Sequence, residues 1–270
     1  MNNNWNDTAI ITIDMQRDTL PGGRLHIKGT ETILNNSVSL LNRAREFGVA
    51  IFHVVRIYLE DGSNAEPVRR RIIRSGKRIL SPGDEGTEIF REFFSPNDVR
   101  LDCPVLLQGG LQTVGEREFI MYKSRWGAFF ETELESELRN RGIARLIFTG
   151  VNFPNCPRTS IYEASERDFD IIAVKDAISG IYEKGIQELS GIGVGIATTA
   201  EILDLFNNGF YYRVFVREAD GRDSVKTFSS LEEARRYADD AASEVENGPV
   251  YARVVDPMER LVYEGRHYAG

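Results

Sequence analysis

The first two thirds of the chain alternate between short apolar runs and longer amphipathic stretches, and this alternation constrains the fold most strongly. Apolar runs rich in β-branched and aromatic residues are typical of strands buried on both faces. They occupy residues 8–14, 49–55, 118–123, 144–151 and 169–176. Stretches that predict helices lie at 30–47, 130–141, 157–168, 183–190 and 193–206. This order predicts an α/β fold in which helices flank a doubly wound, mostly parallel sheet.

A long irregular segment interrupts the alternation. Residues 56–117 contain several turn signals around one predicted helix near 66–78. Long connections in compact domains are usually functional or mobile, so we expect this segment to form either a lid or an oligomer contact. Its basic run "RRRIIRSGKR", residues 69–78, indicates a solvated helix face or a subunit contact, with a lid that receives an anion as the alternative.

The predicted order of strands and helices changes after Asn208. Residues 209–270 read as two strands, an Ala-rich helix at about 230–245 and two further strands, without the earlier strand and helix alternation. We therefore expect a main domain over 1–208 and a small C-terminal α+β appendage of β-β-α-β-β order over 209–270.

Composition excludes several classes of function. The formal net charge of −8 does not suit binding to a nucleic acid backbone. No apolar run is long enough to cross a bilayer, so we expect no membrane partner. The first residues lack the pattern of a signal peptide, and we expect a cytoplasmic protein. Two cysteines are too few for a disulfide framework.

Three chemically useful residues stand at the ends of predicted strands. Asp14 ends the first strand, Lys123 ends the strand at 118–123, and Cys156 follows the strand at 144–151. Because the carboxyl ends of parallel strands meet at one edge of a sheet, we expect the three side chains to converge there. A carboxylate and an ammonium group beside a thiol could tune and relay its proton.

The neighbours of Cys156 favour a reactive thiol. Pro157 suits the first turn of a helix, which would place Cys156 at the N-cap, where free backbone donors and the helix dipole favour a thiolate. The alternative is a thiol that is simply packed, because free cysteines are among the most buried residues. For Cys103 we expect only packing.

Three motifs carry a resemblance to a known family. "TAIITIDMQRD", "YKSRWGAFFETELESELRNRGIARLIFTGVNFPNC" and "SIYEASERDFDIIAVKDAISG" occur in the order found in the isochorismatase-like cysteine hydrolases, which include nicotinamidases, N-carbamoylsarcosine amidases, biuret hydrolases and ureidoacrylate hydrolases. The resemblance covers about residues 7–206. It implies a Rossmann-like, isochorismatase-like fold, a homo-oligomer and a catalytic triad of Asp14, Lys123 and Cys156. It also implies a cis peptide between Val151 and Asn152, with the N–H groups of Asn152 and Cys156 as the oxyanion hole.

The chain departs from the family pattern at several positions. Phe153 and Pro157 stand where the family often has Thr and Val, and Thr19 replaces a common Phe. The Asp-x-His metal motif of nicotinamidases is absent after the second strand, so we expect no catalytic metal and no cofactor. Because the nucleophilic cysteine is retained, the resemblance implies an amide-type substrate.

Other candidates for the site are aromatic and amide side chains near the triad. We expect Trp126, Phe153 and Asn155 to contact substrate, although core packing is the default for aromatic residues such as Trp126. For His53 we expect packing, because no histidine follows a strand beside a Ser or Cys motif.

The pattern as a whole predicts an amidohydrolase, an enzyme that acts on non-peptide C–N bonds. Its substrate would be a small-molecule amide, carbamoyl or ureido compound, cleaved without a metal through a cysteine thioester. An ether or ester hydrolase on the same scaffold and a catalytically silent binding or assembly protein are the alternatives. The release of ammonia or an amine, and the selective alkylation of Cys156, would separate them.

Overall fold

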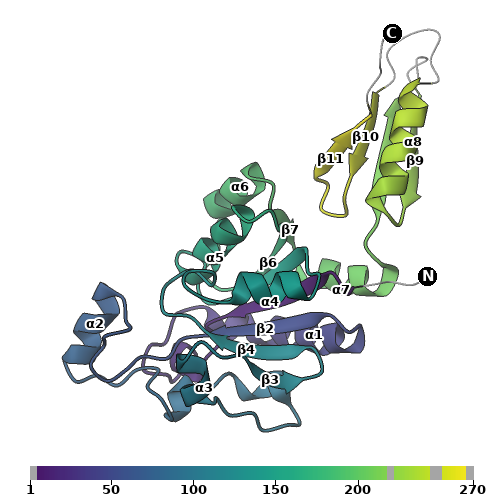
Figure 1. Ribbon diagram of the computed structural model, residues 1–270. Helices are drawn as coiled ribbons and strands as arrows, with labels where there is room; N and C mark the ends of the chain where they lie inside the picture. The colour runs from purple at the N-terminus through teal and green to yellow at the C-terminus, as the bar shows by residue number, and fades with distance from the viewer. Residues whose placement is uncertain (1–4, 218–221, 244–250, 266–270) are drawn as a thin grey trace. The chain divides into compact units, whose positions relative to one another are not determined.

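The strand at the centre of the sheet is the first one in the chain. The computed structural model of the protein describes residues 5–217, 222–243 and 251–265. The chain divides into two compact units between Leu203 and Asp204. In the first unit seven strands form one sheet in the order β3-β4-β2-β1-β5-β6-β7 (Figure 1). Its strands are β1 Thr8–Ile13, β2 Ala50–Val55, β3 Gln112–Gly115, β4 Glu118–Tyr122, β5 Arg145–Gly150, β6 Asp170–Ile178 and β7 Gly195–Ala197.

All neighbouring strands of this sheet are parallel except β3, which pairs antiparallel with β4. The strand order reverses at β1, with β2 and β4 on one side and β5, β6 and β7 on the other. In such sheets ligands bind beside the carboxyl ends of the strands that flank the reversal. The predicted doubly wound, mostly parallel α/β fold is therefore confirmed.

Helices cover both faces of the sheet. They are α1 Leu34–Glu46, α2 Pro67–Arg74, α3 Cys103–Leu107, α4 Leu134–Asn140, α5 Cys156–Ser165, α6 Glu183–Gly191 and α7 Thr199–Asn208. Helices α4, α5 and α6 contribute Leu138, Ile161 and Leu189 to one buried cluster, which also holds Ile11 and Phe52 from β1 and β2. Helix α1 contacts β2 and β6 and buries its own apolar face.

Several element boundaries differ from the prediction. The predicted helix at 193–206 is wrong at its start, because residues Gly195–Ala197 form β7 and pair with β6 before α7 begins. Helices expected at 30–47 and 130–141 begin only at Leu34 and Leu134. The expected N-cap position of Cys156 is also wrong, since α5 begins at Cys156 and Asn155 is its N-cap.

The segment 56–117 is more ordered than its turn signals indicate. Besides α2 it contains the short helix α3, the edge strand β3 and the 3₁₀ turns Glu85–Thr87 and Arg91–Phe94. The remaining 3₁₀ turns are Arg17–Thr19 and Thr30–Thr32.

The second unit is a small antiparallel sheet with one helix. Its elements are β8 Tyr212–Arg217, β9 Asp223–Phe228, α8 Leu231–Ser243, β10 Tyr251–Val255 and β11 Leu261–Glu264. The strands lie in the order β11-β10-β8-β9, and Val214 and Val254 pack with Ala234 and Ala238 of α8 in a separate core. The C-terminal α+β appendage is thus confirmed. Within the described ranges no helix has the length and apolar character needed to cross a membrane.

Candidate active site

Backbone ladders bring Asp14 and Lys123 to the same edge of the sheet. Each is the first residue after its strand, and its N–H continues the ladder to β2: Asp14 N donates to Val54 O at 2.9 Å, and Lys123 N donates to Val55 O at 3.0 Å. Asp14 has a φ of 52°, a left-handed conformation that is uncommon for a non-glycine residue and often occurs at functional positions.

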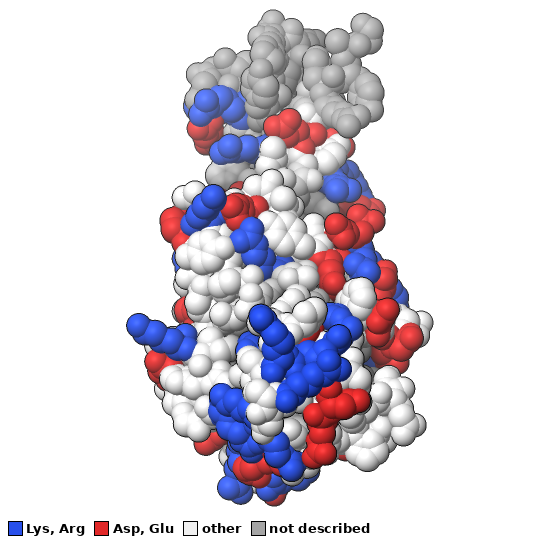
Figure 2. All heavy atoms as spheres, turned by 90° about the vertical axis from the view of Figure 1, so that its left-hand side faces the viewer, with Lys and Arg blue, Asp and Glu red and all other residues white. Residues whose placement is uncertain are grey.

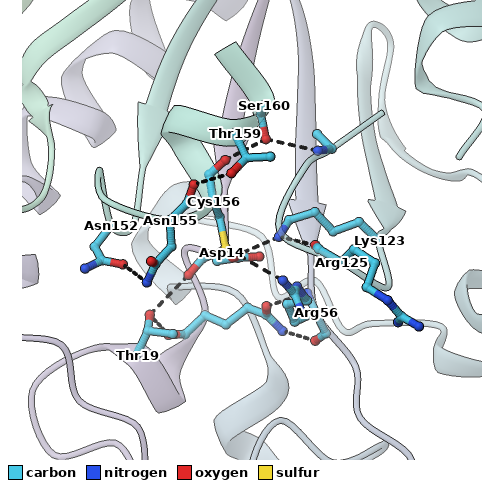
Figure 3. A network of polar contacts seen from close by, with 12 residues as sticks. Asp14, Thr19, Arg56, Lys123, Arg125, Asn152, Asn155, Cys156, Thr159 and Ser160 are labelled. Atoms are coloured by element: carbon cyan, nitrogen blue, oxygen red, sulfur yellow. Dashed lines mark hydrogen bonds and ion pairs between the residues drawn. The ribbon is translucent and has the colours of Figure 1, made fainter. Parts of the chain in front are cut away.

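The two side chains form a buried ion pair. Lys123 Nζ donates to Asp14 Oδ2 at 3.0 Å and to the carbonyl oxygen of Arg125 at 3.2 Å, and the Lys123 side chain is fully buried (Figure 3). A buried charge requires such a partner, because an isolated one is strongly disfavoured. Asp14 Oδ1 has no hydrogen-bond partner among the described residues and belongs to a side chain that lines the same cavity as Cys156.

Cys156 begins α5 and lies beside Asp14 and Arg56 (Figure 3). Burial, and then the negative charge of Asp14, raise the pKa of the Cys156 thiol to about 11, while Lys123 and Arg56 act in the opposite direction. The helix terminus predicts a thiolate, but burial outweighs that influence, so the group is a protonated thiol at neutral pH. A nucleophilic attack by this thiol would need a proton acceptor, and the carboxyl group of Asp14 lines the same cavity.

Arg56 is a site residue that the sequence analysis missed. It follows β2 directly, its side chain is 2% exposed, and its Nη2 lies 3.8 Å from Cys156 Sγ. Its guanidinium also forms an ion pair with buried Glu66 and donates to Tyr58 Oη at 2.9 Å, and Tyr58 Oη donates to Glu66 Oε2 at 3.0 Å. The position after a buried strand, which identified Asp14 and Lys123, is the signal that would have found it.

The loop between β5 and α5 contains Asn152 and ends at Cys156, the two residues whose N–H groups the sequence analysis expects in an oxyanion hole. The peptide bond between Val151 and Asn152 is cis. Asn155 Nδ2 donates to Asn152 Oδ1 at 3.2 Å, and Asn155 N donates to Asn152 O at 3.0 Å. Among the residues that the structure describes, the N–H groups of Asn152 and Cys156 donate to no acceptor. Both residues line the cavity.

A second set of bonds fixes the loop that follows Lys123 against α5. Ser160 Oγ donates to Cys156 O at 2.7 Å and accepts from Ala128 N at 3.0 Å. Glu163 accepts from Phe129 N at 2.9 Å. Gly127 passes so close to Glu163 that a Cβ atom there would lie 2.0 Å from its Oε1. A side chain at this position would therefore displace either the loop or Glu163.

Of the predicted substrate contacts, Trp126 and Asn155 line the cavity and Phe153 does not. The Phe153 side chain is fully buried, and its ring packs against Tyr182 with centroids 5.3 Å apart. Its N–H donates to Ser179 O at 2.8 Å. Because both its backbone and its ring are committed to the core, the placement of Phe153 at the substrate site is corrected.

The cavity measures about 30 Å³, as the volume open to the centre of a water-sized sphere. Its lining combines the strand ends, the segment after β1, α2 with its flanking residues, and the loop before α5: Asp14, Thr19, Leu25, Ile27, Arg56, Tyr58, Arg69, Leu80, Trp126, Val151, Asn152, Asn155 and Cys156. Part of the segment 56–117 thus forms a wall of the cavity. Thr19, one of the lining residues, donates to Gln16 O at 2.7 Å and to Asp14 O at 3.1 Å.

His53 lies away from the cavity and has a packing role. Its Nδ1 lies 2.8 Å from Thr12 Oγ1 and its Nε2 lies 2.8 Å from Glu118 Oε1, and Phe94 packs against the ring. Burial lowers the pKa of His53, although Glu118 counteracts it. Within the described ranges no group of three or more His, Cys, Asp or Glu residues could hold a metal ion.

Comparison with known proteins identifies the class that this fold and site define. A sequence model of the isochorismatase domain matches residues 8–205. The chain therefore belongs to the isochorismatase family of hydrolases.

Individual relatives span nearly the same region. A protein of Arabidopsis thaliana named "probable inactive nicotinamidase" is 30% identical over 203 residues, which is 73% of this chain and 95% of the relative. The ureidoacrylate amidohydrolase of Caulobacter vibrioides is 26% identical over 63% of this chain and 76% of its own. The crystal structure of an isochorismatase family protein from Desulfovibrio vulgaris is similar with a TM-score of 0.61 at 28% identity, over 74% of this chain and 98% of that one.

Proposed function

We propose that the protein is a cysteine hydrolase that cleaves a C–N bond of a small amide, carbamoyl or ureido compound. The observation that carries this proposal is that Asp14 and Cys156 line one cavity while Lys123 holds Asp14 from behind at 3.0 Å. A carboxylate within reach of a nucleophile, itself fixed by a third group, is the arrangement that activates nucleophiles in covalent catalysis.

In the first half-reaction Asp14 accepts the proton of Cys156 as Sγ attacks the carbonyl carbon. The new C–S bond converts the carbonyl oxygen to an oxyanion, which accepts hydrogen bonds from the N–H groups of Asn152 and Cys156. Each such donor contributes about 3 to 4 kcal/mol in comparable oxyanion holes. When the C–N bond breaks, the carboxylic acid of Asp14 returns its proton to the departing nitrogen, which leaves as ammonia or an amine.

In the second half-reaction Asp14 accepts a proton from water, and the water oxygen attacks the thioester carbon. The C–S bond breaks, the acid product is released, and Cys156 is reprotonated by Asp14. Lys123 holds the carboxyl group of Asp14 in place through both steps. Arg56, 3.8 Å from Sγ, stabilises negative charge on the sulfur when it acts as nucleophile and leaving group.

The proposed mechanism needs no metal, because the Asp14 carboxyl group serves as the proton acceptor and the Cys156 thiol as the nucleophile. Similarity to a ureidoacrylate amidohydrolase supports a C–N bond as the target. Similarity to a protein named as inactive makes a direct test of turnover essential.

A screen of small amides, carbamoyl compounds and ureides for ammonia release tests the proposal, with Cys156→Ala protein as the blank. We expect the native protein to turn over at least one compound that the Cys156→Ala protein does not turn over. The circular dichroism spectrum of the Cys156→Ala protein should match that of the native protein. Turnover that persists in the Cys156→Ala protein would exclude the thioester mechanism.

A further inference from the structure

We propose that the substrate carries a carboxylate, that Arg69 on α2 binds this carboxylate, and that the scissile amide or ureido group lies at Cys156. The inference rests on the proposed function, since it names the chemical class of the substrate at the same site. It follows from the contacts of the Arg69 guanidinium in the cavity wall and from the pairing of the other charges of the site.

Arg69 is half-buried and lines the cavity that contains Cys156. Within the described part of the chain no hydrogen bond or ion pair ties its guanidinium to a neighbour. The other arginines of α2 that contact the protein are fixed: Arg70 donates to the carbonyl oxygens of Gly62 and Ala65, and Arg74 donates to that of Asp61. Arg69 is therefore the arginine of α2 that faces the cavity with its donors unused.

The remaining charges of the site are balanced in pairs. Lys123 is neutralised by Asp14, and Arg56 is neutralised by Glu66. Arg69 is left as one positive charge in the cavity wall without a counter-charge among the described residues. A half-buried cation next to a cavity favours an anionic ligand, and the planar fork of a guanidinium matches a carboxylate through two parallel hydrogen bonds.

Helix α2 holds Arg69 on a packed base. Ile73 of α2 belongs to a buried cluster with Tyr58, Ala65, Ile79 and Leu80, and Tyr58 and Leu80 also line the cavity. The cluster is therefore continuous with the cavity wall. A guanidinium on such a base loses less conformational entropy on binding than one on a loose loop.

The rest of the lining suits an apolar segment in the ligand. Leu25, Ile27 and Leu80 add apolar side chains to the cavity lining, which suit a short methylene chain between the two ends of the substrate. Short ω-carboxy amides and N-carbamoyl amino acids have this form. Lys and Arg side chains gather on the face of the first unit that carries α2, which would attract such anions from solution (Figure 2).

The test measures protection of Cys156 from iodoacetamide by two matched series of small compounds. One series is malonamate, succinamate and glutaramate, and the other is the corresponding neutral diamides. Native protein is compared with Arg69→Gln and with the control Arg71→Gln, an exposed arginine of the same helix that does not line the cavity. The three chain lengths vary the distance between the carboxylate and the amide group.

We expect at least one acid to protect native and Arg71→Gln protein at about one tenth of the concentration needed for its diamide, an advantage that falls below about twofold in Arg69→Gln. The proposal is overturned if no acid has an advantage, if no compound protects, or if the advantage survives in Arg69→Gln. Ammonia release from both series, with Cys156→Ala as the blank, separates this inference from the proposed function. Cys156-dependent turnover of the diamides without any preference for the acids would contradict only the carboxylate subsite.

Discussion

Arg56 and Cys156 lie with Nη2 and Sγ 3.8 Å apart at the centre of the site. The guanidinium also forms an ion pair with Glu66 and donates to Tyr58 Oη, and these contacts hold its position without the thiol. The site therefore combines a carboxylate, a cation and a thiol that burial keeps protonated. Five predictions follow from the contacts of these and neighbouring residues.

The first prediction is that Asp14→Asn has opposite effects on the acidity of the Cys156 thiol and on turnover. Asp14→Asn removes a negative charge that raises the pKa of Cys156, so at pH 8 the thiolate fraction and the rate of alkylation by iodoacetamide should increase several-fold. Turnover should nevertheless be lost, because the proton acceptor is gone. In the native protein the alkylation rate should keep rising from pH 7 towards the pKa of about 11. Slower alkylation in Asp14→Asn at pH 8 would contradict the assigned charge effect.

The second prediction concerns the cation beside the sulfur. Arg56 lowers the pKa of Cys156, so Arg56→Gln should shift the pH profile of alkylation to higher pH and reduce kcat/KM at least tenfold. The single variant leaves buried Glu66 without its partner, which would destabilise the fold. The double variant Arg56→Gln/Glu66→Gln removes both charges and should recover stability but not activity. Recovery of both would show that Arg56 has only a structural role.

The third prediction concerns the stability of the buried ion pair. Lys123→Met leaves Asp14 with no cation at 3.0 Å and should lower the free energy of unfolding by about 3 to 5 kcal/mol. In the double variant Lys123→Met/Asp14→Asn the uncompensated charge is absent, so much of the loss should be recovered. Urea unfolding followed by circular dichroism measures both values. Equal stability of the single and double variants would indicate that Asp14 finds another partner.

The fourth prediction distinguishes the ring of Phe153, which lies in the core, from the ring of Trp126, which lines the cavity. Phe153→Leu changes a side chain in the core and should lower the free energy of unfolding by about 1 to 2 kcal/mol with KM unchanged. Trp126→Leu changes the cavity wall and should alter KM with a smaller effect on unfolding. An altered KM in Phe153→Leu, without one in Trp126→Leu, would reverse the assignment of the two rings.

The fifth prediction tests the loop that follows Lys123. In Gly127→Ala the new Cβ collides with the Glu163 carboxyl group, which accepts from Phe129 N. Either Glu163 moves and this bond is lost, or the loop moves, and with it the Arg125 carbonyl that accepts a bond from Lys123. We expect kcat to fall at least tenfold. Glu163→Ala removes the obstacle, and the double variant should regain activity relative to Gly127→Ala. A double variant no more active than Gly127→Ala would point to backbone strain in place of the collision.

The alternation of strands and helices predicted the parallel sheet because burial on both faces leaves a readable pattern. The rule that strand ends converge predicted the meeting of Asp14, Lys123 and Cys156. Strand β7 was missed because three residues, Gly195–Ala197, are too few for a pattern and are held by pairing with β6. The same limit applies to β3, a four-residue edge strand defined by its pairing with β4.

At the site, sequence reasoning failed where long-range contacts decide the outcome. Phe153 is close to Cys156 in sequence, but Tyr182 from a later segment draws its ring into the core. Arg56 acquires its role from Glu66 and Cys156, and the latter lies 100 positions away in the chain. The protonated state of Cys156 depends on burial, which a local reading of the helix start does not include.

The narrowness of the cavity has a consequence for the order of events. A volume of about 30 Å³ has room for roughly one or two water molecules and is too small for an amide with its side group. The residues that line the cavity must therefore separate before a compound reaches the sulfur. Chemical modification of that sulfur should become slower as the reagent grows bulkier, and solvent viscosity should influence catalysis if this separation is the slow step.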